Sequence, residues 1–405
     1  MFQKIDIMFI IAIIWYILNN KKGGLFMTGG TSQGLFVVVA IVIFGIFVLI
    51  SYVLFRDTMK PSLAKIYCDA FTITSKNTGF GKLGNCGVEG VTYEDWVEDL
   101  ENQGYVVAKD DDFTVNWDGT FIYNGTDEKV IVPEIIKGVT ITSVKNMFQN
   151  NTQVKAVAIN NPNVKDMSYM FAYNQLTSLD VSNLVTENVV NMEGMFKGSQ
   201  STSLDISGFD TSKVENMKYM FNNSQATILD VSNWDTSNVE NMFRMFPGSR
   251  ATSLDVSKWN TSNVTDMYEM FANSKATSLD VSSFDTSKVT NMAYMFANTL
   301  PTSLDLSSFD TSNVTSMSGM FYNSQAESLD LSSFDTSNVT GMSQMFQGCQ
   351  ATSLDLSSFD TSNVAQMWRM FQDSKATTAY ARTEADAEKF NTSSEKPTAL
   401  IFSVK

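Results

Sequence analysis

Residues 302–321 read Thr-Ser-Leu-Asp-Leu-Ser-Ser-Phe-Asp-Thr-Ser-Asn-Val-Thr-Ser-Met-Ser-Gly-Met-Phe, and this stretch decides the fold. Leu304 and Leu306 alternate with polar residues, which is the period of a half-buried β-strand. The Phe-Asp-Thr-Ser-Asn segment that follows predicts a turn, because the side chains of Asp310 and Asn313 can bond nearby backbone groups. The first half of the stretch is therefore predicted as a short strand and a turn.

The second half of the stretch predicts one turn of helix. Met317, Met320 and Phe321 stand at positions i, i+3 and i+4, so in a helical turn they share one inward face. We therefore assign the methionine and phenylalanine side chains to a hydrophobic core, and not to a metal or cofactor site.

The stretch belongs to a repeat of 25 residues. The interval between the first two Met-Phe pairs is 23 residues, and the following eight intervals are 25. The pairs begin at Met147, Met170, Met195, Met220, Met245, Met270, Met295, Met320, Met345 and Met370. A fixed period of this size predicts a solenoid, in which each coil buries its apolar face against its neighbours.

This repeat resembles that of the BspA-like leucine-rich-repeat surface proteins of bacteria. The shared motif is Leu-Asp-Leu-Ser-Ser-Phe-Asp-Thr-Ser-Asn-Val-Thr-x-Met-x-x-Met-Phe, over about residues 140–380. The resemblance implies an α+β repeat solenoid, a leucine-rich-repeat-like array of about ten coils with short parallel strands and one helical turn per coil. It also implies a non-catalytic surface protein, often an adhesin for host matrix, host cells or other bacteria. Asn260 departs from the motif by replacing the turn aspartate.

Both ends of the array are expected to be capped, because an open terminal coil recruits other chains. Residues 111–139 contain Asp-Gly and Asn-Gly hairpin signals and predict a β-hairpin cap before the solenoid at 140–378. Residues 379–405 predict a helix opening at an N-cap Thr383, followed by a closing strand over 399–404. Residues 56–110 are expected to form a stalk or small lead-in domain, with a helix over 94–103.

One transmembrane helix is predicted near the N-terminus. Leu35 to Phe55 is an uncharged apolar run of 21 residues, long enough to span the ~30 Å hydrocarbon core. In the preceding segment, 1–34, Lys-Lys-Gly-Gly lies just before Met27 and can be encoded by a ribosome-binding sequence. Two interpretations stay open: translation starts at Met27 and residues 1–26 are untranslated, or the basic N-terminal segment is genuine.

The charge of the chain limits its partners. Formal net charge is −15, histidine is absent, and residues 61–405 carry nearly all of the negative charge. Such a body repels phosphate backbones, so nucleic acid is not an expected partner. No enzyme activity and no cofactor are expected. We expect a single-pass protein of the cell membrane, with residues 61–405 on the cell surface and an extracellular protein or glycan as ligand. The alternative is a pilin-like subunit that assembles through its N-terminal helix.

The outward positions of the repeat suggest a binding site. Within Met-x-x-Met-Phe the two x residues are expected to point outward, and they differ most between repeats. Exposed aromatic residues and arginine often dominate binding energy. The predicted ridge consists of Tyr169, Tyr219, Phe243, Arg244, Tyr268, Tyr294, Trp368 and Arg369. The strand face, with its aspartate and Ser/Thr columns, is the rival site.

The aspartates of the Leu-Asp pairs are expected to stack about 4.8 Å apart. The column includes Asp205, Asp230, Asp255, Asp280 and Asp305. Like charges so close need compensation, either from Ser and Thr hydroxyls or from calcium or a cationic partner.

Three cysteines cannot form a disulfide framework. Cys68 and Cys86 form a disulfide outside the cell or stay as two thiols. Cys349 occupies a position filled elsewhere by Ser or Thr, and is expected to be buried and inert.

Overall fold

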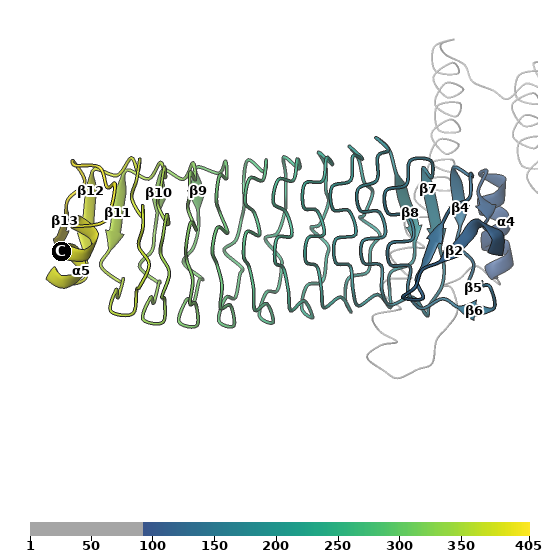
Figure 1. The fold of residues 1–405 in the computed structure, drawn as a ribbon, viewed down its shortest axis with the longest axis horizontal. Helices are drawn as coiled ribbons and strands as arrows, with labels where there is room; N and C mark the ends of the chain where they lie inside the picture. Colours follow the sequence, from purple (N-terminus) through teal and green to yellow (C-terminus); the bar gives the residue numbers. More distant parts are fainter. Residues whose placement is uncertain (1–91) are drawn as a thin grey trace, which may run out of the picture. The chain divides into compact units, whose positions relative to one another are not determined.

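The computed structural model describes residues 92–405, which form a parallel β-solenoid of about 12 turns with few helices (Figure 1). Among these residues, no helix is both long and apolar enough to cross a membrane. The predicted transmembrane segment 35–55, the start at Met27, and Cys68 with Cys86 lie outside the described residues, as does most of the segment 56–110.

The N-terminal end of the array is built from one helix and several short strands. Helix α4 (Tyr93–Asn102) opens with a capping box, in which the Thr92 hydroxyl accepts from the Asp95 N–H and the Asp95 carboxylate accepts from the Thr92 N–H. The elements that follow are β1 (Val106–Val107), η2 (Asp110–Asp112), β2 (Phe113–Val115), β3 (Phe121–Tyr123), β4 (Lys129–Ile131), β5 (Ile135–Ile136) and β6 (Val139–Thr140).

Parallel pairing starts before the Met-Phe repeats. Strands β1 and β4 pair in parallel, and β4 pairs with β7 (Ala156–Ile159), which pairs with β8 (Asp180–Leu184). The hairpins β2–β3 and β5–β6 are antiparallel. The first parallel strand therefore lies within the segment expected to be a lead-in, upstream of residue 140.

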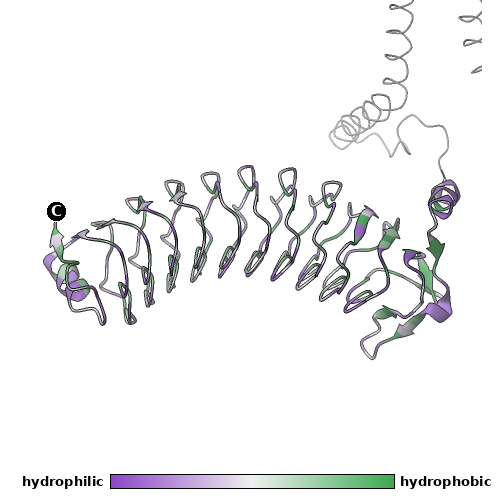
Figure 2. Cartoon of the chain, turned by 90° about the horizontal axis from the view of Figure 1, so that it is seen from above, coloured by the Kyte–Doolittle hydropathy of each residue, from purple (hydrophilic) through white to green (hydrophobic). Residues whose placement is uncertain are grey.

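The middle coils are joined mainly by single hydrogen bonds and isolated bridges. One column of parallel bridges runs without a break from Ser143 to Gln366. Named strands return at β9 (Ser303–Leu304), β10 (Ser328–Leu329) and β11 (Ser353–Leu356). Figure 2 shows these coils following a gentle arc.

The predicted helical turn in each coil is wrong. Within residues 302–347, the Met320 N–H closes a tight turn on the Met317 carbonyl (3.1 Å), but the Gly319 and Phe321 N–H groups donate to Ser343 and Met345 of the next coil (2.8 and 2.9 Å). The residue before the second methionine has a left-handed backbone in all nine turns: Tyr169, Gly194, Tyr219, Arg244, Glu269, Tyr294, Gly319, Gln344 and Arg369. The segment is thus a series of tight turns whose alternate N–H groups donate to carbonyls of the next coil.

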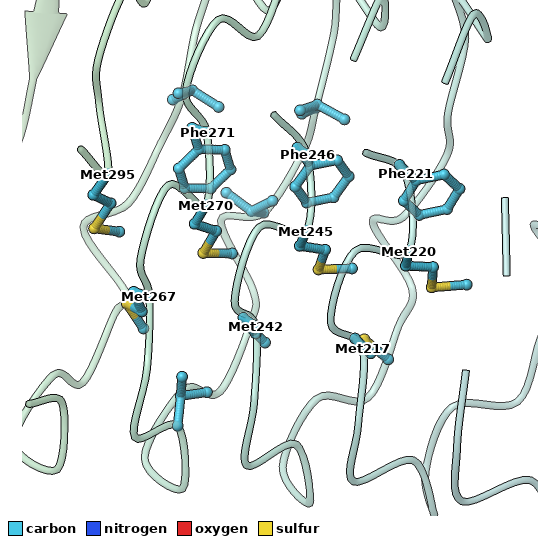
Figure 3. Close-up of a cluster of buried hydrophobic side chains, with 14 of the residues drawn as sticks. Met217, Met220, Phe221, Met242, Met245, Phe246, Met267, Met270, Phe271 and Met295 are labelled. Atoms are coloured by element: carbon cyan, nitrogen blue, oxygen red, sulfur yellow. The ribbon is translucent and has the colours of Figure 1, made fainter. Parts of the chain in front are cut away.

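The predicted core is confirmed. The methionine pairs and the Met-Phe phenylalanines point into one continuous interior, as Figure 3 shows for Phe221, Phe246 and Phe271. Phenylalanine rings of successive coils stack with centroids 5.5–6.0 Å apart, from Phe148 to Phe371.

A second aromatic column lies where the sequence pattern predicted only a turn. It contains Phe209, Trp234, Trp259, Phe284, Phe309, Phe334 and Phe359, all buried. Neighbouring rings lie nearly parallel, with centroids 6.3–6.5 Å apart, from Phe209 to Trp259 and again from Phe284 to Phe359. Seven coils therefore contribute two aromatic rings each to the core.

The C-terminal end of the array contains the predicted helix and strand. Strands β11, β12 (Thr378–Ala381) and β13 (Phe402–Val404) form a parallel sheet, and α5 (Glu384–Asn391) begins after the N-cap Thr383. Buried threonines in the coils donate to a carbonyl of the next coil, as Thr336 does to Asp360 (3.0 Å). Thr361 has no following coil, and its hydroxyl donates instead to the Asp386 carboxylate of α5 (2.6 Å).

Candidate binding surface

Aromatic side chains of neighbouring coils meet on the surface of the array. Ring centroids are 5.3 Å apart between Tyr219 and Phe243, 5.0 Å between Phe243 and Tyr268, and 6.3 Å between Tyr268 and Tyr294. Tyr322 continues the series 6.5 Å from Tyr294. We name Tyr219, Phe243, Tyr268, Tyr294 and Tyr322 the aromatic row. All five side chains are half-buried, so each presents part of its surface to solvent.

The backbone of the turns positions these rings. Tyr219 and Tyr294 have φ values of 57° and 56°, which direct their side chains along the array towards the next coil. A Cβ atom on Gly319 would lie 2.1 Å from the Tyr294 ring, so only glycine leaves room for this ring. The Tyr294 hydroxyl then reaches Gln344, two coils further on, and donates to its Oε1 at 3.0 Å.

Three cationic side chains lie over these rings. The Lys197 ammonium lies 4.5 Å from the Tyr219 ring centroid, and the Lys218 ammonium 5.3 Å from that of Phe243. The Arg244 guanidinium lies 5.2 Å from the Tyr268 ring and donates to Glu269 at 2.8 Å. Cation–π contacts of this kind add to the ring packing and fix the long side chains.

The electrostatic setting keeps the hydroxyls of Tyr268 and Tyr294 protonated. Burial raises the pKa of Tyr268 above its ordinary value, and the neighbouring Glu269 raises it further. Burial also raises the pKa of Tyr294. The hydrogen bond to Glu269 raises the pKa of Arg244. At neutral pH Tyr268 and Tyr294 therefore offer phenolic hydroxyl groups, beside apolar ring surface and the ion pair of Arg244 with Glu269.

The structure brings together only part of the predicted ridge. Tyr219, Phe243, Arg244, Tyr268 and Tyr294 lie in one connected group.

Tyr169 joins this group indirectly, because Lys197 lies 5.9 Å from its ring and close to that of Tyr219. Trp368 and Arg369 contact one another, with the guanidinium 4.1 Å from the ring centroid, but they lie near the C-terminal cap and make no ring contact with the row. The outward direction expected for both x positions is also wrong in places, since Ser168 and Ala293 are buried.

Sequence reasoning missed Tyr322, Lys197 and Lys218. Tyr322 and Lys197 each directly follow the phenylalanine of a Met-Phe pair. An alignment of the repeats that included this next position would have shown that it also varies. Lys218 occupies one of the x positions, but the predicted ridge includes only aromatic residues and arginines. Its position over Phe243 depends on side-chain direction, which the repeat alone does not reveal.

The rival strand face has its charges satisfied locally. Asp255 and Asp305 each accept hydrogen bonds from the N–H and hydroxyl of the serine two residues on. These bonds lower the pKa of both carboxyls. Residues 92–405 contain no group of three or more Cys, Asp or Glu side chains placed to hold a metal ion. A shallow pocket of about 390 Å³ lies on this face, beside Asp255, Asp280 and Pro301.

The fold and its period define the chain as a parallel β-solenoid repeat protein. Residues 142–254, 225–327 and 300–404 each match the family described as "Mycoplasma protein of unknown function, DUF285", and the chain belongs to this family. No curated protein and no solved structure matches the chain.

Proposed function

We propose that this chain is a membrane-anchored bacterial cell-surface protein whose solenoid mediates adhesion by binding an extracellular protein or glycan, without catalysis. The observation that carries the proposal is the aromatic row with its three cations, Lys197, Lys218 and Arg244. The resemblance of the repeat to BspA-like leucine-rich-repeat proteins supports it.

The row has the physical properties of a binding surface. Its rings are packed against one another and tied by hydrogen bonds, so little conformational entropy is lost when a ligand orders them further. Aromatic side chains with one polar end bury large areas and still donate hydrogen bonds. Stacking also covers ring faces, since Phe243 and Tyr268 lie face to face with an interplanar angle of 16°. A ligand therefore meets mainly ring edges, phenolic hydroxyls and cations.

The anchor and its orientation form the second half of the proposal. The apolar run 35–55 is proposed to span the membrane, with residues 61–405 outside. Protease added to intact cells should then remove the solenoid, as detected with an antibody against it. Complete protection in intact cells, with cleavage after lysis, would contradict the surface location.

Binding is tested with the purified full chain on arrays of glycans and matrix proteins. The proposal expects saturable binding to a restricted set of ligands, detected with an antibody to the C-terminal cap. Binding to no glycan and no protein, together with formation of filaments that require residues 35–55, would instead support a pilin-like subunit.

A further inference from the structure

The last coil leaves part of the hydrophobic core uncovered. In preceding coils the valine and methionine columns are fully buried beneath the same residues of the next coil, as Val339 and Met342 are. The columns end at Val364 and Met367, which are only partly buried. No further coil follows, because the chain enters the cap instead (Figure 1).

The cap replaces the missing coil with polar residues. Twenty-five residues after Val364 and Met367 the chain carries Lys389 and Thr392, where a further repeat would carry valine and methionine. Between the two layers lies an open pocket of about 300 Å³. Trp368 stands at this pocket with 51% of its surface exposed. An open depression, which no side chain fills, thus lies between the polar cap and the uncovered apolar column.

The backbone at the same place offers an unused donor. In the preceding coil the Met342 N–H donates to the Gln366 carbonyl at 2.7 Å, and the Gln344 N–H to the Trp368 carbonyl at 2.8 Å. In the last coil the Arg369 N–H donates to the Ser394 hydroxyl at 3.1 Å. The Met367 N–H has no acceptor within residues 92–405.

We propose that this pocket docks an extended peptide segment of a partner protein, which inserts an aliphatic or methionine side chain against Val364, Met367 and Trp368. The array itself shows what covers these columns: the same segment of the next coil, which presents apolar side chains to the columns and backbone carbonyls to alternate N–H groups. A peptide carbonyl pairs with the Met367 N–H, in the manner of strand addition to a sheet edge.

Charge has a minor part in this recognition. The Lys389 ammonium donates to the Thr361 carbonyl at 2.6 Å, and Arg369 pairs with Glu395 at 2.9 Å. Recognition rests on the apolar pocket and the backbone donor. The inference is independent of the aromatic row, because the two surfaces share no residue.

The test uses the full chain and a labelled synthetic peptide with the sequence of residues 338–344, Asn-Val-Thr-Gly-Met-Ser-Gln. This segment contains the valine and methionine that cover the preceding coil. We expect saturable binding by fluorescence anisotropy. A control peptide with serine in place of Val339 and Met342 should bind at least about tenfold more weakly, since burying one aliphatic side chain is worth more than a decade in affinity.

Two variants locate the site. Lys389→Val combined with Thr392→Met fills the pocket from the cap with the side chains of an ordinary coil. It should lower peptide affinity at least about tenfold while the protein melts at the same or a higher temperature. Trp368→Ala should also weaken binding, whereas Trp117→Ala, at an almost fully exposed tryptophan of the N-terminal hairpin, should not. Absence of saturable binding, or unchanged affinity in the filled variant, overturns the proposal.

Discussion

Single residues in the left-handed backbone region shape every coil. A non-glycine residue in this region is strained by about 1–2 kcal/mol, yet most of the nine turns place an ordinary side chain there. The hydrogen bonds between coils hold these residues in place, since in every coil before the last the alternate N–H groups find a carbonyl of the next coil. Glycine is required where a tyrosine ring crosses the turn, as Tyr294 crosses Gly319.

Gly319→Ala tests this crossing. The added Cβ would displace the Tyr294 ring and break its hydrogen bond to Gln344, so the variant should lose at least about 1–2 kcal/mol of unfolding free energy. Adding Tyr294→Ala removes the collision, and the double variant should be less destabilised than the sum of the two single variants. Chemical denaturation of all three proteins gives the coupling energy. Simple additivity would show that the ring does not lie over Gly319.

Asp386 should make the C-terminal cap sensitive to acid. Burial raises the pKa of this carboxyl, but hydrogen bonds from Thr361, Thr383 and Arg382 outweigh burial and hold the pKa at about 2, below its ordinary 3.8. Because the folded pKa is depressed, the stabilisation is complete above the unfolded pKa and is lost as pH falls through the folded pKa. We expect a contribution of about 2 kcal/mol that disappears between about pH 4 and pH 2.

Denaturation of Asp386→Asn and the natural protein at several pH values checks this expectation. The stability difference between the two proteins should shrink as pH falls from 5 to 2. Asp373→Asn, at an exposed residue of the last coil, is the matched control and should show no comparable trend. A difference for Asp386→Asn that is constant over this range would contradict the assigned role.

At the level of the element, a middle coil such as residues 302–321 contributes two stacked aromatic rings, two methionines and a buried threonine to the core. Replacing Phe296 with Ala in a middle coil should cost about 3–5 kcal/mol, because the ring is fully buried and stacked on both sides. Neighbouring coils should lose protection first, since solenoid stability is a sum of nearest-neighbour terms. Hydrogen exchange of the coils around residues 271–321 measures this spread. A loss below about 1 kcal/mol would mean that the column is not core.

The 25-residue period predicted the solenoid and its core, because period and apolar composition are properties of the sequence itself. It failed for the Met-x-x-Met-Phe turn, where i, i+3 and i+4 spacing fits a helix as well as a tight turn with left-handed residues. Here hydrogen bonds to the next coil override the local preference. Phe309 was assigned to a turn for a similar reason, although its recurrence every 25 residues indicated a core column.

At the scale of the whole molecule, the core residues are nearly the same in successive coils, and the sequence differences between coils lie on the surface. The aromatic row lies on middle coils, and the uncovered pocket lies at the cap. The repeat alignment predicted which positions vary, and five residues of the predicted ridge do lie together. Trp368 and Arg369 lie apart from them, because the x positions of the two intervening coils carry Ser-Gly and Ser-Gln. The alignment could not predict that Lys218 lies over Phe243, since this contact depends on side-chain direction.

The most direct test of the proposed function is adhesion by cells that carry a variant of the row. The row variant replaces four residues together with alanine: Tyr219, Phe243, Arg244 and Tyr268. A matched control replaces four residues of the strand face: Ser253, Asp255, Ser278 and Asp280. Loss of ring pairs should lower stability by about 0.5–1.5 kcal/mol per pair, so surface amount and melting temperature are measured for both proteins. The row variant is predicted to abolish adhesion and the control to retain it. Undiminished adhesion in a folded, surface-exposed row variant would contradict the account, and loss in the control alone would place the site on the strand face.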